Sequence, residues 1–223
     1  MWVKICANTN LEDALLASEL GADAIGFVFA PSKRQVNVEQ VAAITSKLPA
    51  GIETIGVFTS GNAAEILAAA QAARLTGVQL HGHTDPALIE TLRAAGGSNL
   101  RLVQVVGFER GKEAEFAAAL EQALRHPGID AVLLDTVKSG VSGGLGVTFD
   151  WSSAAQIVRR LYEQTRSQTK LIVAGGLHAD NVAEAIAIFQ PDGVDVASGT
   201  EASAGRKDPA RVQAFLTAAR SNP

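Results

Sequence analysis

Residues 170–199 read KLIVAGGLHADNVAEAIAIFQPDGVDVASG, and the order of segments within them is the best guide to the architecture. Apolar, β-branched runs at 170–176 and 193–199 predict two strands, and the Ala- and Ile-rich segment 179–189 predicts a helix between them. Both strand segments are apolar on both faces, which is typical of parallel strands covered by helices. The stretch therefore predicts a strand–helix–strand unit with parallel strands.

The same alternation continues along the whole chain. It predicts further strands at 2–7, 24–29, 53–58, 77–82, 101–108 and 131–136, and further helices at 10–20, 37–48, 61–73, 85–95, 112–126, 151–165 and 208–220. Eight strand–helix pairs in 223 residues favour a closed (β/α)8 barrel, the TIM-barrel fold, over an open sheet. We expect one domain over residues 1–223. The longest connection, Val137–Asp150, is glycine-rich, which indicates a functional loop.

Composition and charge exclude several classes of protein. Hydrophobic residues make up 47% of the chain and charged residues 19%, so the chain is too apolar to be disordered. No apolar run approaches the roughly 20 residues of a membrane span, and we expect no signal peptide. The net charge of −4 argues against nucleic-acid binding.

The cysteine content and the closed barrel bear on compartment and assembly. A single cysteine, Cys6, excludes an intrachain disulfide and a cysteine-based zinc site. It also fits a reducing compartment, so we expect a cytoplasmic protein. A closed barrel leaves no exposed strand edge to pair with another copy, so we expect a monomer.

Two ionisable residues stand at strand ends, where barrels of this kind place their active sites. Cys6 ends the first strand and Asp135 the sixth, so both can face one substrate across the barrel mouth. Lys4 lies two residues before Cys6, on the same face of the strand, and its charge would favour the thiolate. Burial would raise the pKa of Asp135 and keep it a proton donor. This base and acid can move a proton between adjacent carbons, although a buried cysteine and a salt-bridged aspartate are the structural alternatives.

Two glycine-containing turns predict a phosphate site. Gly175 and Gly176 follow the seventh strand, and Ser198 and Gly199 follow the eighth. In barrels, the backbone N–H groups of these turns and of a short extra helix, expected here at 200–205, bind phosphate. Arg34 follows the second strand and can bind a carboxylate through two parallel hydrogen bonds, although it could equally be a solvated surface cation.

The remaining polar residues at strand positions are candidates for supporting roles. Gln79 and His81 share one face of the fourth strand, and Asp195 lies inside the eighth, where it can accept a hydrogen bond or tie down a loop. No second histidine occupies a matching strand end, so we expect no metal. These residues predict a small-molecule substrate.

Several motifs, in order along nearly the whole chain, resemble the phosphoribosylanthranilate isomerase family, cofactor-free barrel enzymes of tryptophan synthesis. They are Lys4-Ile5-Cys6, Gly26–Phe29 with Pro31–Arg34, Gly56–Phe58, Val78–Gly82, Leu134–Thr136, Gly143–Gly146 with Phe149–Trp151, Ala174–Leu177 with Asn181-Val182, and Gly193–Val196 through Ser198-Gly199 to Lys207-Asp208. Departures from the usual pattern are Ala7 in place of the glycine that normally follows the cysteine, His83-Thr84, Thr200 and Ala204.

The resemblance implies an Amadori rearrangement of N-(5-phosphoribosyl)anthranilate without a cofactor. By analogy, Asp135 would protonate the ribose ring oxygen and Cys6 would take the proton from C2. Arg34 would hold the anthranilate carboxylate. Backbone groups at the two glycine turns, Gly175-Gly176 and Ser198-Gly199, would hold the phosphate.

Three other functions compete with this one. The sugar isomerases of histidine synthesis catalyse the analogous reaction but use an aspartate on the first strand, where this chain has Cys6. A pentose-phosphate epimerase needs several His and Asp metal ligands that the sequence does not supply. A silent barrel that only binds a sugar phosphate would need neither Cys6 nor Asp135.

Overall fold

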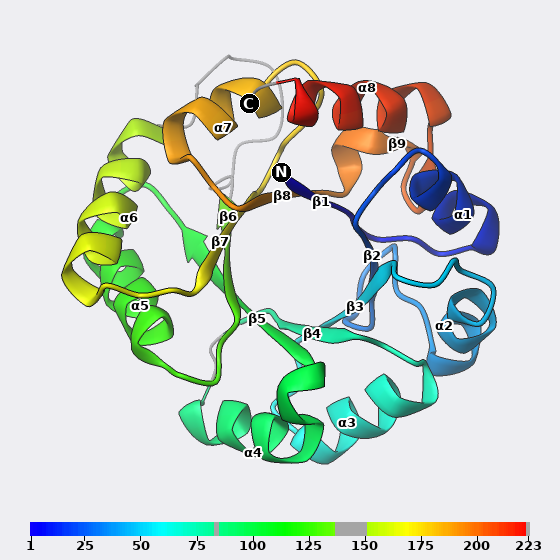
Figure 1. The fold of residues 1–223 in the computed structure, drawn as a ribbon, viewed down its shortest axis with the longest axis horizontal. Coiled ribbons are helices and arrows are strands. Elements are labelled where there is room, and N and C mark those ends of the chain that lie inside the picture. Colours follow the sequence, from blue (N-terminus) through cyan, green and yellow to red (C-terminus); the bar gives the residue numbers. More distant parts are fainter. Residues whose placement is uncertain (83–84, 137–150, 222–223) are drawn as a thin grey trace.

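The computed structural model describes residues 1–82, 85–136 and 151–221, so the predicted loop 137–150 and His83-Thr84 lie outside it. Its parallel strands close into one barrel in sequence order (Figure 1), which confirms the predicted fold. The strands are β1 (Trp2–Ile5), β2 (Ala24–Val28), β3 (Glu53–Phe58), β4 (Gly77–Leu80), β5 (Arg101–Phe108), β6 (Ala131–Thr136), β7 (Lys170–Ala174) and β8 (Gly193–Val196).

Helices alternate with the strands and surround the barrel (Figure 1). They are α1 (Leu11–Glu19), α2 (Val38–Thr45), α3 (Ala63–Ala72), α4 (Pro86–Gly96), α5 (Glu113–Arg125), α6 (Trp151–Thr165), α7 (Val182–Phe189) and α8 (Pro209–Arg220), with a short 3-10 turn, η1 (Gly97–Asn99), after α4. Asp85 and Asp208 accept backbone N–H groups at the starts of α4 and α8, each followed by proline in the first turn. Among the described residues, no helix is long and apolar enough to cross a bilayer.

The core has two parts. A large apolar layer lies between the strands and the helices, and a smaller cluster fills the barrel interior. The interior cluster consists of Val103, Val105, Ala131, Leu133, Ile172 and Ala174, with Trp2 packed against it. The barrel is therefore a filled core with no central channel.

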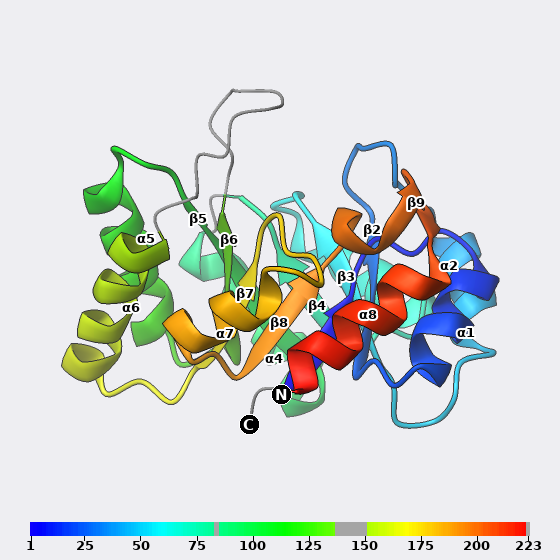
Figure 2. The same ribbon diagram turned by 90° about the horizontal axis from the view of Figure 1, so that it is seen from above.

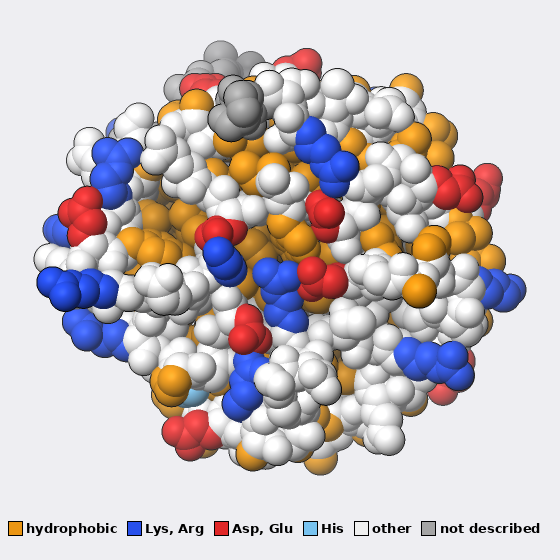
Figure 3. All heavy atoms as spheres, viewed as in Figure 1, with side chains coloured by type: hydrophobic (Ala, Val, Ile, Leu, Met, Phe, Trp, Pro, Cys, Tyr) orange, Lys and Arg blue, Asp and Glu red, His pale blue; other side chains and the backbone are white. Residues whose placement is uncertain are grey.

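Charged side chains gather at the amino ends of the strands, the end seen in Figure 3. Arg101 pairs with Glu53 at 2.8 Å and lies 4.8 Å from the centre of the Trp2 ring, while the Trp2 indole N–H donates to Glu53. Further ion pairs on this end are Arg93–Asp130, Lys170–Asp192 and Arg220–Asp23. These contacts cover the amino end of the barrel.

The segment after β8 differs from the prediction. The extra 3-10 helix, η2, spans Ser198–Thr200, and residues 201–207 form an antiparallel hairpin of β9 (Glu201–Ser203) and β10 (Arg206–Lys207) instead of the short helix expected at 200–205. Long-range contacts hold the hairpin. The Thr9 hydroxyl donates to the Gly205 carbonyl at 2.6 Å, and the Lys207 N–H donates to Asp13 at 2.9 Å. Figure 2 shows β9 beside the loops that follow β1 and β2.

Candidate active site

Cys6 follows the last residue of β1, and its side chain lies inside the barrel at the carboxyl end of the strands. Its backbone N–H donates to Val196 on β8 at 2.7 Å, and the residue is only 6% exposed. The neighbouring strand makes room for it at Gly26, where an added Cβ would lie 2.6 Å from the Cys6 sulfur and 2.9 Å from Lys4 Cε. The absence of a side chain at Gly26 therefore lets Lys4 and Cys6 share the space in front of β2.

Lys4 is fully buried beneath Cys6 and is paired on both sides. Its ammonium lies 2.9 Å from Asp195 Oδ2 and donates to Gln79 Oε1 at 2.8 Å. The barrel register places Lys4 directly opposite Asp195 on the adjacent strand. The structure thus brings together Lys4, Gln79 and Asp195, three residues that the sequence suggested for supporting roles.

Burial changes the pKa of the Cys6 thiol more than the lysine beneath it does. Burial raises the pKa of the Cys6 thiol above its usual 9.0 and is the largest effect; Lys4 and Lys207 lower it, and Asp195 raises it. The expectation that Lys4 would favour the thiolate is correct for that one contact. The net shift is nevertheless upward, because desolvation of the anion outweighs both cations.

Asp135 lies near the end of β6, and the direction of its pKa shift is the one predicted. Burial raises the pKa of this carboxyl, His81 and Lys4 lower it, and Asp195 raises it. Lys4 and Asp195 act electrostatically on both Asp135 and Cys6. The buried Lys4–Asp195 pair therefore acts electrostatically on both the thiol and the carboxyl, while His81 is exposed just after β4.

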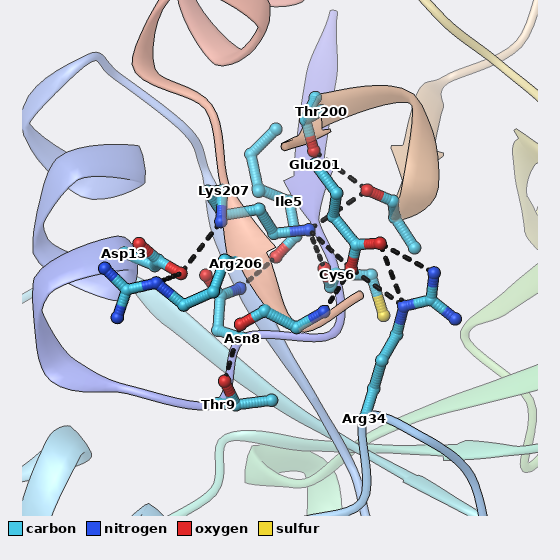
Figure 4. A network of polar contacts seen from close by, with 12 residues as sticks. Ile5, Cys6, Asn8, Thr9, Asp13, Arg34, Thr200, Glu201, Arg206 and Lys207 are labelled. Carbon is cyan, nitrogen blue, oxygen red and sulfur yellow. Dashed lines mark hydrogen bonds and ion pairs between the residues drawn. The ribbon is translucent and has the colours of Figure 1, made fainter. Parts of the chain in front are cut away.

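Arg34, in the loop after β2, is held by a carboxylate of the protein itself (Figure 4). Its Nε lies 2.8 Å from Glu201 Oε1, and its Nη2 lies 2.6 Å from Glu201 Oε2. The Arg34 side chain is 29% exposed, and the Cys6 thiol acts electrostatically on it. The structure thus places Arg34 near Cys6 as a partly exposed cation with one edge already paired.

The two predicted glycine turns lie against each other. A Cβ at Gly199 would lie 2.0 Å from the Leu177 carbonyl oxygen, so the turn after β8 packs directly on the backbone that follows β7. Gly175 and Gly176 adopt left-handed backbone angles, with φ of 85° and 66°. The Asn181 side chain donates to the Gly176 carbonyl at 3.1 Å and helps to shape this turn.

Sequence reasoning missed three buried polar residues around Cys6: Asn8, Glu201 and Lys207. The Lys207 ammonium donates to the backbone carbonyls of Cys6 at 2.6 Å and Ala197 at 3.0 Å. Lys207 stood in one of the motifs but was given no role. Its burial depends on the hairpin, which no local pattern indicated. No group of three or more His, Cys, Asp or Glu side chains in the described part of the chain could hold a metal ion.

A (β/α)8 barrel with a thiol and a carboxyl around one buried ion pair, at the carboxyl ends of its strands, belongs to the class of barrel enzymes that use acid–base chemistry. Comparison with known proteins narrows the class to one family. The family model described as N-(5'phosphoribosyl)anthranilate (PRA) isomerase matches residues 3–218. The chain therefore belongs to the phosphoribosylanthranilate isomerase family.

Individual relatives agree over their full lengths. The N-(5'-phosphoribosyl)anthranilate isomerase of Pseudomonas putida (strain W619) is 40% identical, over 96% of this chain and 95% of the relative. That of Symbiobacterium thermophilum is 41% identical, over 99% and 98%. The crystal structure of phosphoribosyl anthranilate isomerase from Thermotoga maritima covers 99% of both chains at 36% identity, with a TM-score of 0.83. A crystal structure of a phosphoribosyl anthranilate isomerase in complex with reduced 1-(o-carboxyphenylamino)-1-deoxyribulose 5-phosphate is 35% identical over 99% of both chains, with a TM-score of 0.81.

Proposed function

We propose that this chain converts N-(5-phosphoribosyl)anthranilate to 1-(2-carboxyphenylamino)-1-deoxyribulose 5-phosphate, with Cys6 as general base and Asp135 as general acid. The observation that supports this assignment is the shared electrostatic environment of the two groups, since the buried Lys4–Asp195 pair acts on both. One proton donor and one proton acceptor around a common centre are what a proton shift between neighbouring carbons requires.

The rearrangement proceeds by two proton transfers and a tautomerisation. Asp135 gives its proton to the ribose ring oxygen, the C1–O bond breaks, and the nitrogen lone pair forms an iminium at C1. The Cys6 thiolate takes the proton from C2, and the C–H electrons form a C1–C2 double bond that neutralises the iminium. The resulting enol gives the C2 ketone when C1 gains a proton and the C2 hydroxyl loses one. No electrons leave the substrate, so the reaction needs no redox cofactor.

Arg34 and the glycine turns bind the two anionic ends of the substrate in this proposal. Glu201 occupies the Nε–Nη2 edge of Arg34, and the edge formed by Nη1 and Nη2 suits a second, planar carboxylate. The turns at Gly175-Gly176 and Ser198-Gly199 meet at the Gly199 contact and offer closely spaced backbone groups to the phosphate. Gln79 and Asp195 act by holding Lys4, and His81 acts by lowering the pKa of Asp135.

The deciding experiment is a turnover assay without metal. Anthranilate and ribose 5-phosphate condense to supply the substrate, EDTA is present, and the disappearance of phosphoribosylanthranilate is followed. Turnover by the wild-type chain supports the proposal. Turnover only of the aminoaldose intermediate of histidine synthesis would replace it with that activity, and tight binding of the product analogue without turnover of either substrate would indicate a silent barrel.

We also propose a compartment and an oligomeric state for the enzyme. We place it in the cytoplasm, since its single cysteine suits a reducing compartment. We propose that the monomer is sufficient, since every group assigned above comes from one chain. Sedimentation of the active protein tests the oligomeric state.

A further inference from the structure

Two buried charged residues border the site without touching the substrate in the mechanism above. Glu201 and Lys207 lie opposite each other on the hairpin β9–β10, and each is 5% exposed. The Lys207 ammonium lies 3.7 Å from Glu201 Oε1 (Figure 4). A buried ion pair costs desolvation energy and gives little net stability, so its presence at this place calls for another explanation.

Glu201 fixes the direction in which Arg34 points. Both of its carboxylate oxygens contact Arg34, at 2.8 Å and 3.1 Å to Nε and at 2.6 Å to Nη2. Glu201 is itself held from behind, because its Oε1 accepts the Gly205 N–H at 3.3 Å and its backbone carbonyl accepts the Arg211 guanidinium. Arg34 sits on a loop, so without this partner its long side chain would sample many rotamers.

Lys207 fixes the backbone that carries Cys6. Its ammonium donates to the Cys6 carbonyl at 2.6 Å and to the Ala197 carbonyl at 3.0 Å, which joins the end of β1 to the turn after β8. It also supplies a positive charge beside the thiol. The other charged groups that act on Cys6 are Lys4 on β1, Asp195 on β8 and Arg34 on the loop after β2.

We propose that Glu201 and Lys207 are positioning residues with separate tasks: Glu201 orients Arg34 toward the substrate carboxylate, and Lys207 holds Cys6 in place and favours its thiolate. The inference rests on the proposed function for the meaning of these tasks. Its central test, the alkylation of Cys6, needs no substrate. Failure of the positioning roles can therefore be told apart from failure of the proposed function.

The test of Lys207 uses the only cysteine of the chain as its reporter. The rate of Cys6 alkylation by iodoacetamide is measured against pH in the wild type, in Lys207→Met and in the control Arg206→Met, which removes the neighbouring exposed cation. We expect the inflection of Lys207→Met to move to higher pH, because one cation beside the thiolate is gone, and that of the control to stay. An inflection unchanged in Lys207→Met overturns the assignment.

Turnover gives a second reading of the same variant. A shift of one pH unit in the thiol corresponds to about a tenfold lower thiolate fraction at neutral pH, so kcat falls by about that factor while KM stays near wild type. Lys207→Arg keeps the charge and should recover part of kcat. Where Lys207→Met fails to fold, Lys207→Gln retains a hydrogen-bond donor without the charge and is measured in the same way.

The test of Glu201 separates KM from kcat. In Glu201→Gln we expect KM, and the Kd of reduced 1-(o-carboxyphenylamino)-1-deoxyribulose 5-phosphate, to rise at least fivefold while kcat and the alkylation profile stay near wild type. Glu65→Gln, on an exposed surface of α3, is the matched control. A loss of kcat at constant KM and constant Kd would overturn the role given to Glu201.

Discussion

The setting of the Cys6 side chain depends both on the absence of a side chain at Gly26 and on the charged groups around the thiol. The space for its sulfur exists because Gly26 has no side chain, and its neighbour along the chain, Ala7, adopts a conformation that costs energy for any residue except glycine. The sequence located Cys6 at a strand end and Lys4 beneath it. It could not weigh the two cations against desolvation, since that balance depends on how completely the closed barrel excludes water.

Replacing Cys6 by serine should abolish most of the turnover. A serine hydroxyl is a far weaker proton acceptor than a thiolate, so we expect kcat to fall by about 10²- to 10⁴-fold while the product analogue still binds. Steady-state kinetics and calorimetric binding measure the two effects. Turnover near the wild-type rate in Cys6→Ser would remove Cys6 from the role of general base.

Replacing Ala7 by glycine should stabilise the protein. Ala7 is 1% exposed and has a φ of 63°, in the left-handed region that glycine adopts without strain. After the greater freedom of glycine in the unfolded chain is subtracted, we expect a gain of about 0.5–1 kcal/mol in the free energy of unfolding. Chemical denaturation measures it.

The control for Ala7→Gly is Ala68→Gly, at an exposed position within α3. The backbone there is helical, so glycine should cost about 1 kcal/mol. A loss of stability in both variants would mean that Ala7 is not strained.

At the scale of the elements, three aspartates that precede strands act in the same way. Asp23, Asp130 and Asp192 precede β2, β6 and β8, and each accepts the backbone N–H of a residue in the preceding strand of the barrel. Each also pairs with a cation at the amino end, namely Arg220, Arg93 and Lys170. The repeated contact fixes how neighbouring strands start relative to each other.

Removing one of these contacts should lower stability without touching the site. In Asp130→Ala the Leu102 N–H loses a charged acceptor at 2.7 Å, and Arg93 loses its carboxylate partner. We expect a loss of about 1–2 kcal/mol, mostly from the hydrogen bond, because the ion pair is partly exposed. Thermal unfolding measures it, with Asp180→Ala as control because the Asp180 side chain is 95% exposed. Equal melting temperatures of the two variants would contradict the expectation.

Sequence patterns predicted the barrel strands well and missed the hairpin after β8. The eight barrel strands were predicted to within three residues at either end, because each is rich in apolar residues that a parallel sheet must bury on both faces. The hairpin at 201–207 was not predicted. Its residues, Glu-Ala-Ser-Ala-Gly-Arg-Lys, lack an alternating apolar pattern, and contacts with Thr9 and Asp13, far away in the chain, hold it. The buried roles of Glu201 and Lys207 were hidden for the same reason.

At the scale of the whole molecule, the reaction depends on the protonation of a pair of groups. Burial raises the pKa of the Asp135 carboxyl above 3.8 and that of the Cys6 thiol above 9.0. The proposed mechanism needs a protonated Asp135 and a Cys6 thiolate. That form carries one proton between the two groups, so its share of the singly protonated pair does not change with pH.

The pH profile follows from this count of protons. We expect kcat/KM to rise as pH increases through the raised pKa of Asp135, because the pair then loses its second proton. It should fall again as pH passes the raised pKa of Cys6, because the pair then loses its last one. Rates measured from pH 4 to 10, with the fold checked by circular dichroism at each pH, test the expectation. A rate that keeps rising beyond the pH at which Cys6 becomes fully alkylatable would contradict it.

The closure of the barrel between β1 and β8 has a consequence for how the enzyme is made. Cys6 is translated long before Asp195 and Lys207, the latter 201 positions later. Until then β1 has no partner on one side, and the nascent chain carries an open sheet edge that a neighbouring chain could pair with. The thiol also stays outside its buried setting until these segments have been made. Activity therefore begins only once β8 and the hairpin β9–β10 have left the ribosome.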